Sequence, residues 1–170
     1  FLSMIRYATH SEYAHIGMVV KDTNYLEKPL KGTFLWESGY EGTPDPQDGK
    51  VKLGVQLTDF KDIKKNYTNA NFYVRRLKDN SIFTREKLRD IHKIVYEVPY
   101  DIHPLDWILA FFHEDNCKKK IDRFWCSAFV GYIFSDLGIL SEKVDWSILA
   151  PADFGLDGEN LIYSDEKKNR

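Results

Sequence analysis

The first part of the chain contains short apolar runs separated by turn-forming residues. Residues 14–20 (AHIGMVV) and 33–38 (TFLWES) are rich in β-branched and aromatic side chains, which favours strands. Apolar and polar positions alternate in residues 50–60 (KVKLGVQLTDF), and residues 71–78 (NFYVRRLK) form another short β-prone run. The alternation places four apolar side chains on one face of the third run: Val51, Leu53, Val55 and Leu57. The pattern predicts four strands, with a loop over residues 39–49, which contain three glycines and two prolines.

From residue 84 onward the hydrophobic period changes to that of a helix. Residues 84–98 (TREKLRDIHKIVYEV) have an amphipathic helical pattern with Thr84 as the N-cap. The apolar face would consist of Leu88, Ile91, Ile94 and Val95. Residues 104–114 and 122–138 predict two further helices, and the last would end at Gly138. Strands that precede helices, rather than alternate with them, indicate an α+β fold.

The length and composition fit one folded domain. The chain has 170 residues, of which 43% are hydrophobic and 15% aromatic, and this is enough for a packed core. We expect a single domain over residues 1–163 and a frayed, charged tail over residues 164–170 (SDEKKNR). The N-terminal residues FLSMIRYATH are too short and too polar for a secretory signal.

Charge and cysteine usage narrow the classes of partner. Lys and Arg number 24 and Asp and Glu 26, which gives a net charge of −2 with the basic residues dispersed among the acids. This balance argues against a nucleic-acid interface. No apolar run approaches the roughly 18 residues of a membrane-spanning helix. Two cysteines, Cys117 and Cys126, are too few for a disulfide framework; they leave a single bridge open as an alternative to the reducing compartment that the low count favours. Oligomeric state does not follow from these patterns.

The stretch RFWCSAFVGYIF (residues 123–134) places Cys126 near the beginning of the last predicted helix. A thiol attacks as its thiolate, and a helix N-terminus favours that negative charge. The backbone N–H of Cys126 would also suit an oxyanion. The spacing fits a packed core thiol equally well, because Cys126 shares an apolar helix face with Val130, Ile133 and Leu137. The pattern alone leaves both interpretations open.

His15 is the best candidate for a base. It opens an apolar strand and is followed closely by Gly17, which suits a cleft better than a core. The other histidines lie in polar segments, helices or a turn: His10, His92, His103 and His113. Glu37 ends the next strand and would fix the tautomer of His15. The alternatives are a structural His15 and a solvated Glu37. No CxxC or HExxH spacing is present, so we predict no metal site.

A series of motifs contains these residues: YAHIGMVV, LWESGYEG, VKLGVQLTDFKDI, NFYVRRL, VPYD, FWCSAFVGYIF and LAPADF. In this order, over roughly residues 13 to 155, they resemble the circularly permuted papain-like hydrolases, which are the YiiX/YaeF-type and poxviral relatives of the NlpC-type enzymes. The specific feature is the order of histidine before cysteine, since ordinary papain-like enzymes run the other way. The resemblance implies a permuted papain-like fold, with an antiparallel sheet or small barrel packed against helices.

The resemblance also implies a catalytic set, with Cys126 as nucleophile, His15 as base and Glu37 as the residue that orients the base. The expected activity is that of a thiol hydrolase that cleaves an amide bond through an acyl-enzyme, without a cofactor. Peptide, isopeptide, peptidoglycan-type and lipid amides are the substrate classes implied. In a chain with 15% aromatic residues most are expected in the core, but three are candidates to line an apolar substrate groove: Trp36, Tyr100 and Trp125.

Two alternatives to hydrolysis stay open. The first is acyl transfer, because lipid acyltransferases of the same superfamily also have their histidine before their cysteine in the chain. The other is a non-catalytic structural or interaction module, for instance a virion protein that kept the fold. It is suggested by Ala128, because family members often carry an acid there, in the sequence CSE. A viral origin would place the protein in the cytoplasm or the virion.

Overall fold

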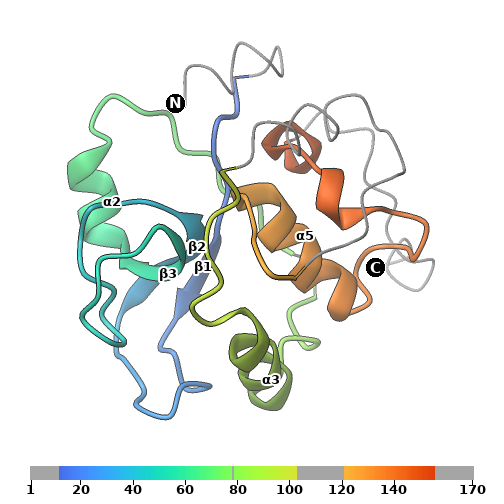
Figure 1. Cartoon of the computed structure of the whole chain (residues 1–170), viewed down its shortest axis with the longest axis horizontal. Coiled ribbons are helices and arrows are strands. Elements are labelled where there is room, and N and C mark those ends of the chain that lie inside the picture. Colours follow the sequence, from blue (N-terminus) through green and yellow to red (C-terminus); the bar gives the residue numbers. More distant parts are fainter. Residues whose placement is uncertain (1–11, 78, 103–120, 156–170) are drawn as a thin grey trace.

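The computed structural model describes residues 12–77, 79–102 and 121–155, and these residues form an α+β fold (Figure 1). The strands form an antiparallel sheet in the order β1-β2-β3, with β1 (Met18–Lys21), β2 (Thr33–Gly39) and β3 (Gly54–Asp59). The helices are α2 (Phe60–Asn66), α3 (Arg85–Val95) and α5 (Cys126–Asp136), followed by the 3-10 turns η1 (Trp146–Ile148) and η2 (Pro151–Phe154). The α+β class expected from the order of strands and helices is confirmed.

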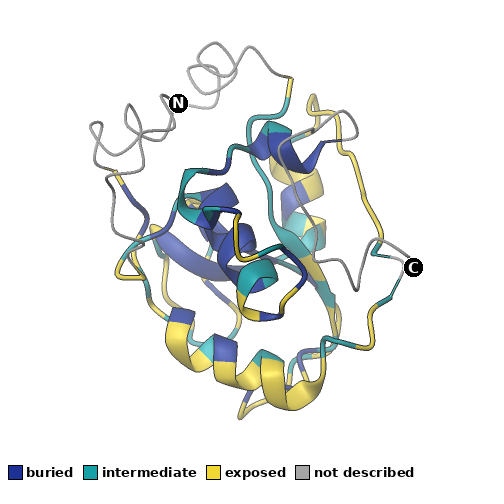
Figure 2. Cartoon of the chain, turned by 90° about the vertical axis from the view of Figure 1, so that its right-hand side faces the viewer, coloured by how far each residue is buried: buried dark blue, intermediate teal, exposed yellow. Residues whose placement is uncertain are grey.

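The core lies between the sheet and α5. β2 is the central strand of the sheet, and α5 contacts it directly, so both elements are mostly buried (Figure 2). Trp36 of β2 packs edge-on against Phe129 of α5, with ring centroids 5.4 Å apart. Side chains alternate along a strand, so Glu37 points to the opposite face from Trp36. That opposite face is covered by α2, which contacts β2 and β3.

The first three predicted strands are confirmed, with shifted ends. Residues 50–60 contain β3, but the strand begins only at Gly54 and is buried on both faces, including Gln56 and Thr58. Val51 and Leu53 were expected on the buried face, yet each is about half exposed. These two residues lie in the loop before the strand. Only the second half of the predicted alternating segment is therefore a strand.

The fourth predicted strand, residues 71–78, is wrong. Residues 71–77 make no strand pairing in the structure, and residue 78 lies outside the described residues. Leu77 is partly buried against the core, whereas three apolar side chains of this run are about half exposed or more: Phe72, Tyr73 and Val74. The segment is held instead by Arg75, whose guanidinium donates hydrogen bonds to the carbonyl oxygens of Phe154 and Gly155, both at 2.8 Å. Its β-prone composition therefore reflects a cleft wall rather than a sheet.

The helical predictions hold in part. α3 lies within the predicted residues 84–98, and the Thr84 side chain caps it by accepting a hydrogen bond from the Lys87 N–H. Of its expected apolar face, Ile91 and Val95 are buried, whereas Ile94 is 47% exposed. The predicted helix over residues 104–114 and the tail over residues 164–170 lie outside the described residues.

Two helix boundaries differ from the prediction. α5 starts at Cys126 instead of residue 122, and Gly138 follows its end with φ +67°, as a helix terminator does. α2 was missed, because its seven residues are shorter than the periods used to recognise helices. Its signal was Asp59, whose side chain accepts a hydrogen bond from the Lys61 N–H as an N-cap.

The loop between β2 and β3 is fastened by a buried carboxylate. Asp45 is fully buried and accepts hydrogen bonds from the ammonium of Lys52 at 2.8 Å and from the Leu57 N–H at 3.2 Å. Lys52 also pairs with Asp48 at 2.7 Å. Buried charges are stable only when paired and hydrogen-bonded in this way. The network ties the loop to Leu57 of β3, which is paired with Trp36 of β2.

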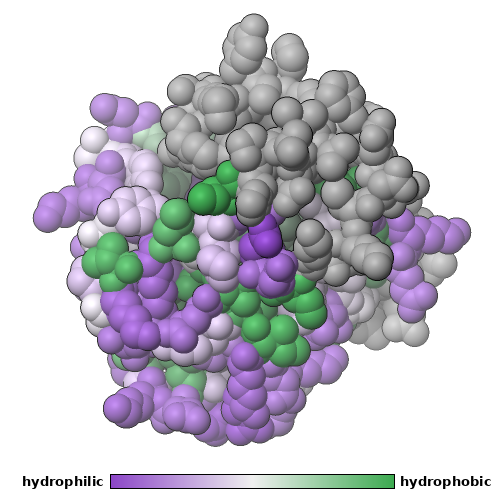
Figure 3. Space-filling view, in the orientation of Figure 1, coloured by the Kyte–Doolittle hydropathy of each residue, from purple (hydrophilic) through white to green (hydrophobic). Residues whose placement is uncertain are grey.

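The described part of the chain offers no helix of the length and apolarity that crossing a lipid bilayer requires. On the face seen in Figure 3, hydrophobic side chains occur as small patches between hydrophilic ones.

We expect Gly54→Ala to be strongly destabilising. Gly54 has φ +152°, and a Cβ there would collide with the Val98 carbonyl oxygen and lie 2.9 Å from the Pro99 Cα. Strain of this kind plus the collision should lower the free energy of unfolding by more than about 2 kcal/mol in urea denaturation. The matched control is Gly49→Ala, where φ is +75° but no atom lies within 4 Å, so the expected loss is about 1 kcal/mol. Equal losses would contradict the close approach.

Candidate active site

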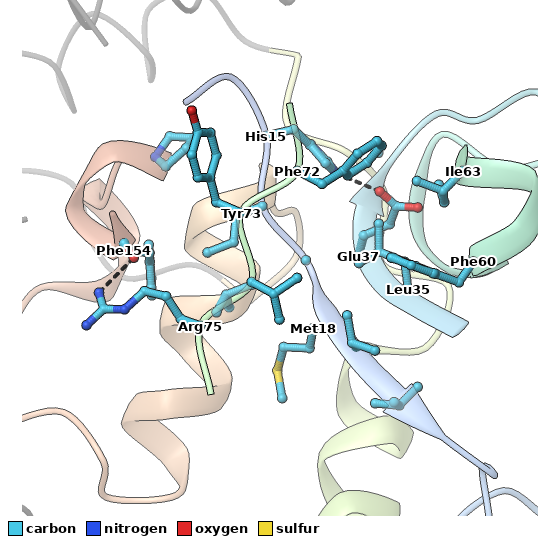
Figure 4. A pocket seen from close by; sticks show the side chains of 18 of the residues that line it. His15, Met18, Leu35, Glu37, Phe60, Ile63, Phe72, Tyr73, Arg75 and Phe154 are labelled. Atoms are coloured by element: carbon cyan, nitrogen blue, oxygen red, sulfur yellow. Dashed lines mark hydrogen bonds and ion pairs between the residues drawn. The ribbon is translucent and has the colours of Figure 1, made fainter. Parts of the chain in front are cut away.

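His15 and Glu37 contact each other at one end of the sheet. His15 Nε2 lies 2.6 Å from Glu37 Oε2, as the dashed line in Figure 4 shows. The two residues are 22 apart in the chain, and strand pairing brings them together. Met18 at the start of β1 is paired with Trp36 of β2, so the segment just before β1 runs alongside the end of β2. The register thus places a histidine and a carboxylate where the sequence predicted them to meet.

Two glycines leave room for this contact. A Cβ on Gly39 would lie 3.3 Å from His15 Cε1 and 3.4 Å from Glu37 Oε2. A Cβ on Gly17 would lie 2.9 Å from Leu35 Cδ1 and 3.1 Å from Glu37 Cβ. Both distances at Gly17 are tighter than packed atoms normally allow. The absence of side chains at these positions lets the backbone of residues 15–17 lie against β2.

The Glu37 carboxylate is fixed from both sides. It is fully buried, and Oε1 accepts a hydrogen bond from the Thr58 hydroxyl at 2.9 Å while Oε2 contacts His15. Thr58 lies on β3, the neighbour of the central strand, so the carboxylate on β2 is held in place from the adjacent strand. A group with both oxygens engaged cannot rotate freely, which makes Glu37 a rigid partner for the imidazole.

Cys126 is the first residue of α5, and its thiol lies close enough to the His15 ring for the two groups to shift each other's pKa. The backbone N–H groups of Ile16 and Ser127 also lie near enough to the sulfur to lower the pKa of the thiol. Because Glu37 occupies Nε2, the ring nitrogen that faces the thiol is Nδ1. The structure therefore brings together all three residues of the predicted catalytic set.

The electrostatics of the pair favour a thiolate and an imidazolium. Burial raises the pKa of Cys126, but the charge of His15, its hydrogen bond and the two backbone N–H groups outweigh burial and lower that pKa. Burial likewise lowers the pKa of His15, yet the Cys126 thiolate and then the Glu37 carboxylate raise it well above its ordinary value. Each charge is stabilised by its neighbour, which is the arrangement of an activated cysteine.

A cleft opens beside the three residues. His15, Ile16, Glu37 and Tyr100 line it, so groups that touch or lie near the sulfur form part of its wall. Cys126 itself is 2% exposed and is not among the cleft-lining residues, so the sulfur lies behind the wall that His15, Ile16 and Tyr100 form. In Figure 4, Phe72 lies near His15 and Glu37, while Phe60 and Ile63 of α2 lie beyond the carboxylate. The cleft thus runs between residues 12–22 on one side and the extended residues 71–77 on the other.

Of the three aromatic residues predicted to line a substrate groove, one lines the cleft and two do not. Tyr100 lines the cleft, and its pKa is raised by burial and by the nearby Cys126. Trp36 is a correction: it is 1% exposed and packs in the core against Tyr25 and Phe129, because it points to the sheet face opposite Glu37. Trp125 is not among the cleft-lining residues either, and its indole N–H donates to the Leu149 carbonyl oxygen at 3.2 Å.

Several residues of the site were missed by sequence reasoning. Thr58 and Ile16 act through a hydroxyl and a backbone N–H, for which a single sequence carries no signal. Glu41 and Tyr67 form a further polar pair in the cleft, with the Tyr67 hydroxyl donating to Glu41 Oε1 at 3.0 Å. Glu41 lies four residues after Glu37, but its loop position gave no reason to place its side chain near His15.

No metal centre accompanies the site within the described residues, because no three His, Cys, Asp or Glu side chains are arranged there to hold an ion. The thiol of Cys126 is free. The Cys126 thiol and the His15 imidazole are groups capable of nucleophilic attack by sulfur with proton transfer by imidazole.

We expect Cys126 to react with iodoacetamide well below the pH at which an ordinary thiol ionises. The midpoint of its pH–rate profile, followed by mass spectrometry of the Cys126 peptide, should lie below the free-thiol value of about 8.5. Glu37→Gln removes a charge that supports the imidazolium, so it should lower the pKa of His15 and move the Cys126 midpoint up by about one pH unit.

The control for this profile is Glu142→Gln, which removes an equal charge from an exposed position that does not line the cleft. It should leave the midpoint unchanged. A wild-type midpoint at or above about 8.5 would show that no ion pair forms.

Comparison with protein-family models, with curated proteins and with solved structures found no match for this chain. The functional proposal below accordingly rests on the geometry of His15, Glu37 and Cys126, together with the motif resemblance drawn from the sequence.

Proposed function

We propose that the protein is a cysteine hydrolase that cleaves an amide bond, built on a circularly permuted papain-like fold. The observation that carries the proposal is the position of the His15 ring, with Glu37 bound at Nε2 and the Cys126 thiol on its other side. A buried cysteine that served only as packing would need neither a cationic partner nor two N–H donors on its sulfur. The chain order of histidine, acid and cysteine supports the permuted family.

The first half of the reaction forms a thioester. The Cys126 thiolate attacks the carbonyl carbon of the amide, and the carbonyl oxygen takes the negative charge. The unpaired N–H groups at the start of α5, including that of Cys126, are suited to stabilise this oxyanion. The imidazolium of His15 donates its Nδ1 proton to the amide nitrogen, the C–N bond breaks, and the amine leaves.

The second half regenerates the enzyme. Neutral His15 takes a proton from a water molecule, and the resulting hydroxide attacks the thioester carbonyl carbon. The C–S bond breaks, the carboxylic acid product leaves, and Cys126 returns as the thiolate beside the imidazolium. Glu37 holds the ring orientation through both halves and stabilises each imidazolium, while Thr58 holds Glu37. No cofactor takes part in this scheme.

Acyl transfer is a second candidate, and the shape of the cleft favours it in one respect. Beyond His15 the cleft continues along apolar side chains, among them Met18, Leu35 and Phe134, which suit a hydrocarbon chain. In that case an alcohol or amine would replace water in the second half. Product analysis with an added lysolipid or amine acceptor separates the two reactions, because transfer yields an acylated acceptor and hydrolysis a free acid.

The alanine at position 128, where family members often carry an acid, does not alter the proposed reaction. Ala128 is 3% exposed and packs in the hydrophobic core, and it supplies no charged or polar side chain to the reaction. A non-catalytic module that merely kept the fold would have no need for the His15–Glu37 contact. Turnover by the purified chain decides between the two.

We expect Cys126→Ala to abolish amide hydrolysis, with kcat/KM falling at least about 10³-fold, because the nucleophile is removed. His15→Ala should cause a similar loss, and Glu37→Gln a loss of about 10²-fold, since it weakens the orientation of the base. Cleavage of a library of amide substrates, followed by mass spectrometry, measures these values.

The matched control is Cys117→Ser, which alters the only other cysteine of the chain. It should retain full activity. Hydrolysis that survives in Cys126→Ala would rule out the proposed nucleophile, and circular dichroism of each variant shows whether the fold is retained.

A further inference from the structure

The cleft contains a second carboxyl group that the proposed reaction does not use. Glu41 lies in the loop after β2, and its Oε1 accepts a hydrogen bond from the Tyr67 hydroxyl at 3.0 Å. Its Oε2 is buried and has no hydrogen-bond partner among the described residues. Buried polar oxygens are nearly always paired, so an unpaired one in a cleft points to a group that a ligand supplies.

Glu41 is electrostatically coupled to the proposed catalytic set. Burial, and after it the negative charge of Glu37, raises the pKa of Glu41 to about 7, although the Tyr67 hydroxyl and the charge of His15 oppose the rise. Near neutral pH this carboxyl group is therefore divided between its neutral and ionised forms. A ligand that binds the ionised carboxylate would therefore bind more tightly as pH rises.

The charges around Glu41 indicate what kind of ligand would fit. The carboxylate of Glu37, the imidazolium of His15 and the thiolate of Cys126 together leave one excess negative charge, and an ionised Glu41 adds another. Within the described residues no Lys, Arg or His side chain forms an ion pair with Glu41. This end of the cleft is thus short of positive charge.

The side chains nearby suit a cation as well. Phe72 and Tyr67 line the same cleft as Glu41, whereas the nearby ring of Phe60 already has the ammonium of Lys64 over its face, 5.4 Å from the ring centroid. Aromatic faces attract ammonium groups, most strongly where water is excluded. In the facing segment, the guanidinium of Arg75 is occupied by the carbonyl oxygens of Phe154 and Gly155.

We propose that Glu41 and Tyr67 form a subsite that binds a primary ammonium group of the substrate, through Glu41 Oε2. The inference rests on the proposed amide hydrolysis only for the identity of the reacting bond. It narrows the substrate class to amides that carry an aliphatic amine near the scissile bond. Glu41 is then a specificity-determining residue, and Tyr67 positions its carboxylate.

A direct binding experiment tests the subsite without catalysis. The intact chain is titrated with n-butylammonium chloride and, separately, with 1-butanol, and amide NMR shifts report binding. At pH 7.5, Glu41→Gln should weaken butylammonium binding at least tenfold and leave butanol binding unchanged. Glu142→Gln removes the same charge at an exposed position outside the cleft lining, and should change neither.

The pH dependence and a second variant add independent readouts. Butylammonium affinity should rise between pH 6 and 8, because Glu41 ionises over this range, whereas butanol affinity should stay level. Tyr67→Phe removes a hydrogen bond to the ionised carboxylate, so it should shift this rise to higher pH. Equal butylammonium binding by wild type and Glu41→Gln would overturn the subsite, as would an affinity that is level across this pH range.

The two proposals can fail separately. Butylammonium binding that depends on Glu41, in a chain that hydrolyses no amide, would support the subsite and overturn the hydrolase. If amides are hydrolysed, the ratio of kcat/KM for an amine-bearing amide to that for its neutral isostere should fall at least tenfold in Glu41→Gln. An unchanged ratio would leave the hydrolase standing and overturn the subsite.

Discussion

The site depends on the contact between the His15 imidazole and the Glu37 carboxylate. The Glu37 carboxylate is fully buried and the His15 side chain is 29% exposed, so an isolated charge on Glu37 would be costly. The contact makes an imidazolium tolerable there, and the imidazolium in turn makes the Cys126 thiolate tolerable. The three charges are therefore stable only together. Removal of any one leaves a neighbour unpaired, so the geometry of the set matters more than the presence of any single residue.

The fold supplies this geometry with few elements. The antiparallel pairing of β1 and β2 brings His15 to Glu37, and β3 contributes Thr58 to hold the carboxylate. The start of α5 provides the sulfur and the N–H groups that suit negative charge. Each partner thus comes from a different element of one sheet-and-helix core, which is rigid enough to keep their distances short.

The cleft has two parts with different chemistry. Around the sulfur, each charged group of the catalytic set has an oppositely charged neighbour, since the His15 imidazolium faces both the Cys126 thiolate and the Glu37 carboxylate. The Glu41 carboxylate has no such ion-pair partner among the described residues: one oxygen is bound by the Tyr67 hydroxyl and the other has no hydrogen-bond partner. A catalytic set needs its charges held by one another, whereas a recognition site leaves a group for the ligand to pair with. That contrast distinguishes the two carboxyl groups, Glu37 and Glu41, although they lie four residues apart.

The sequence by itself determined the class of fold, most strand and helix positions, and the identity of His15, Glu37 and Cys126 as candidates. These follow from local signals: apolar period, caps, and the order of the three residues along the chain. Only the tertiary structure decided that residues 71–77 form a cleft wall instead of a strand, because pairing depends on a partner distant in the chain. It also decided that Trp36 faces the core and that Glu41 meets Tyr67. Which face a side chain takes, and what it then meets, depends on strand register and loop path, and neither is encoded locally.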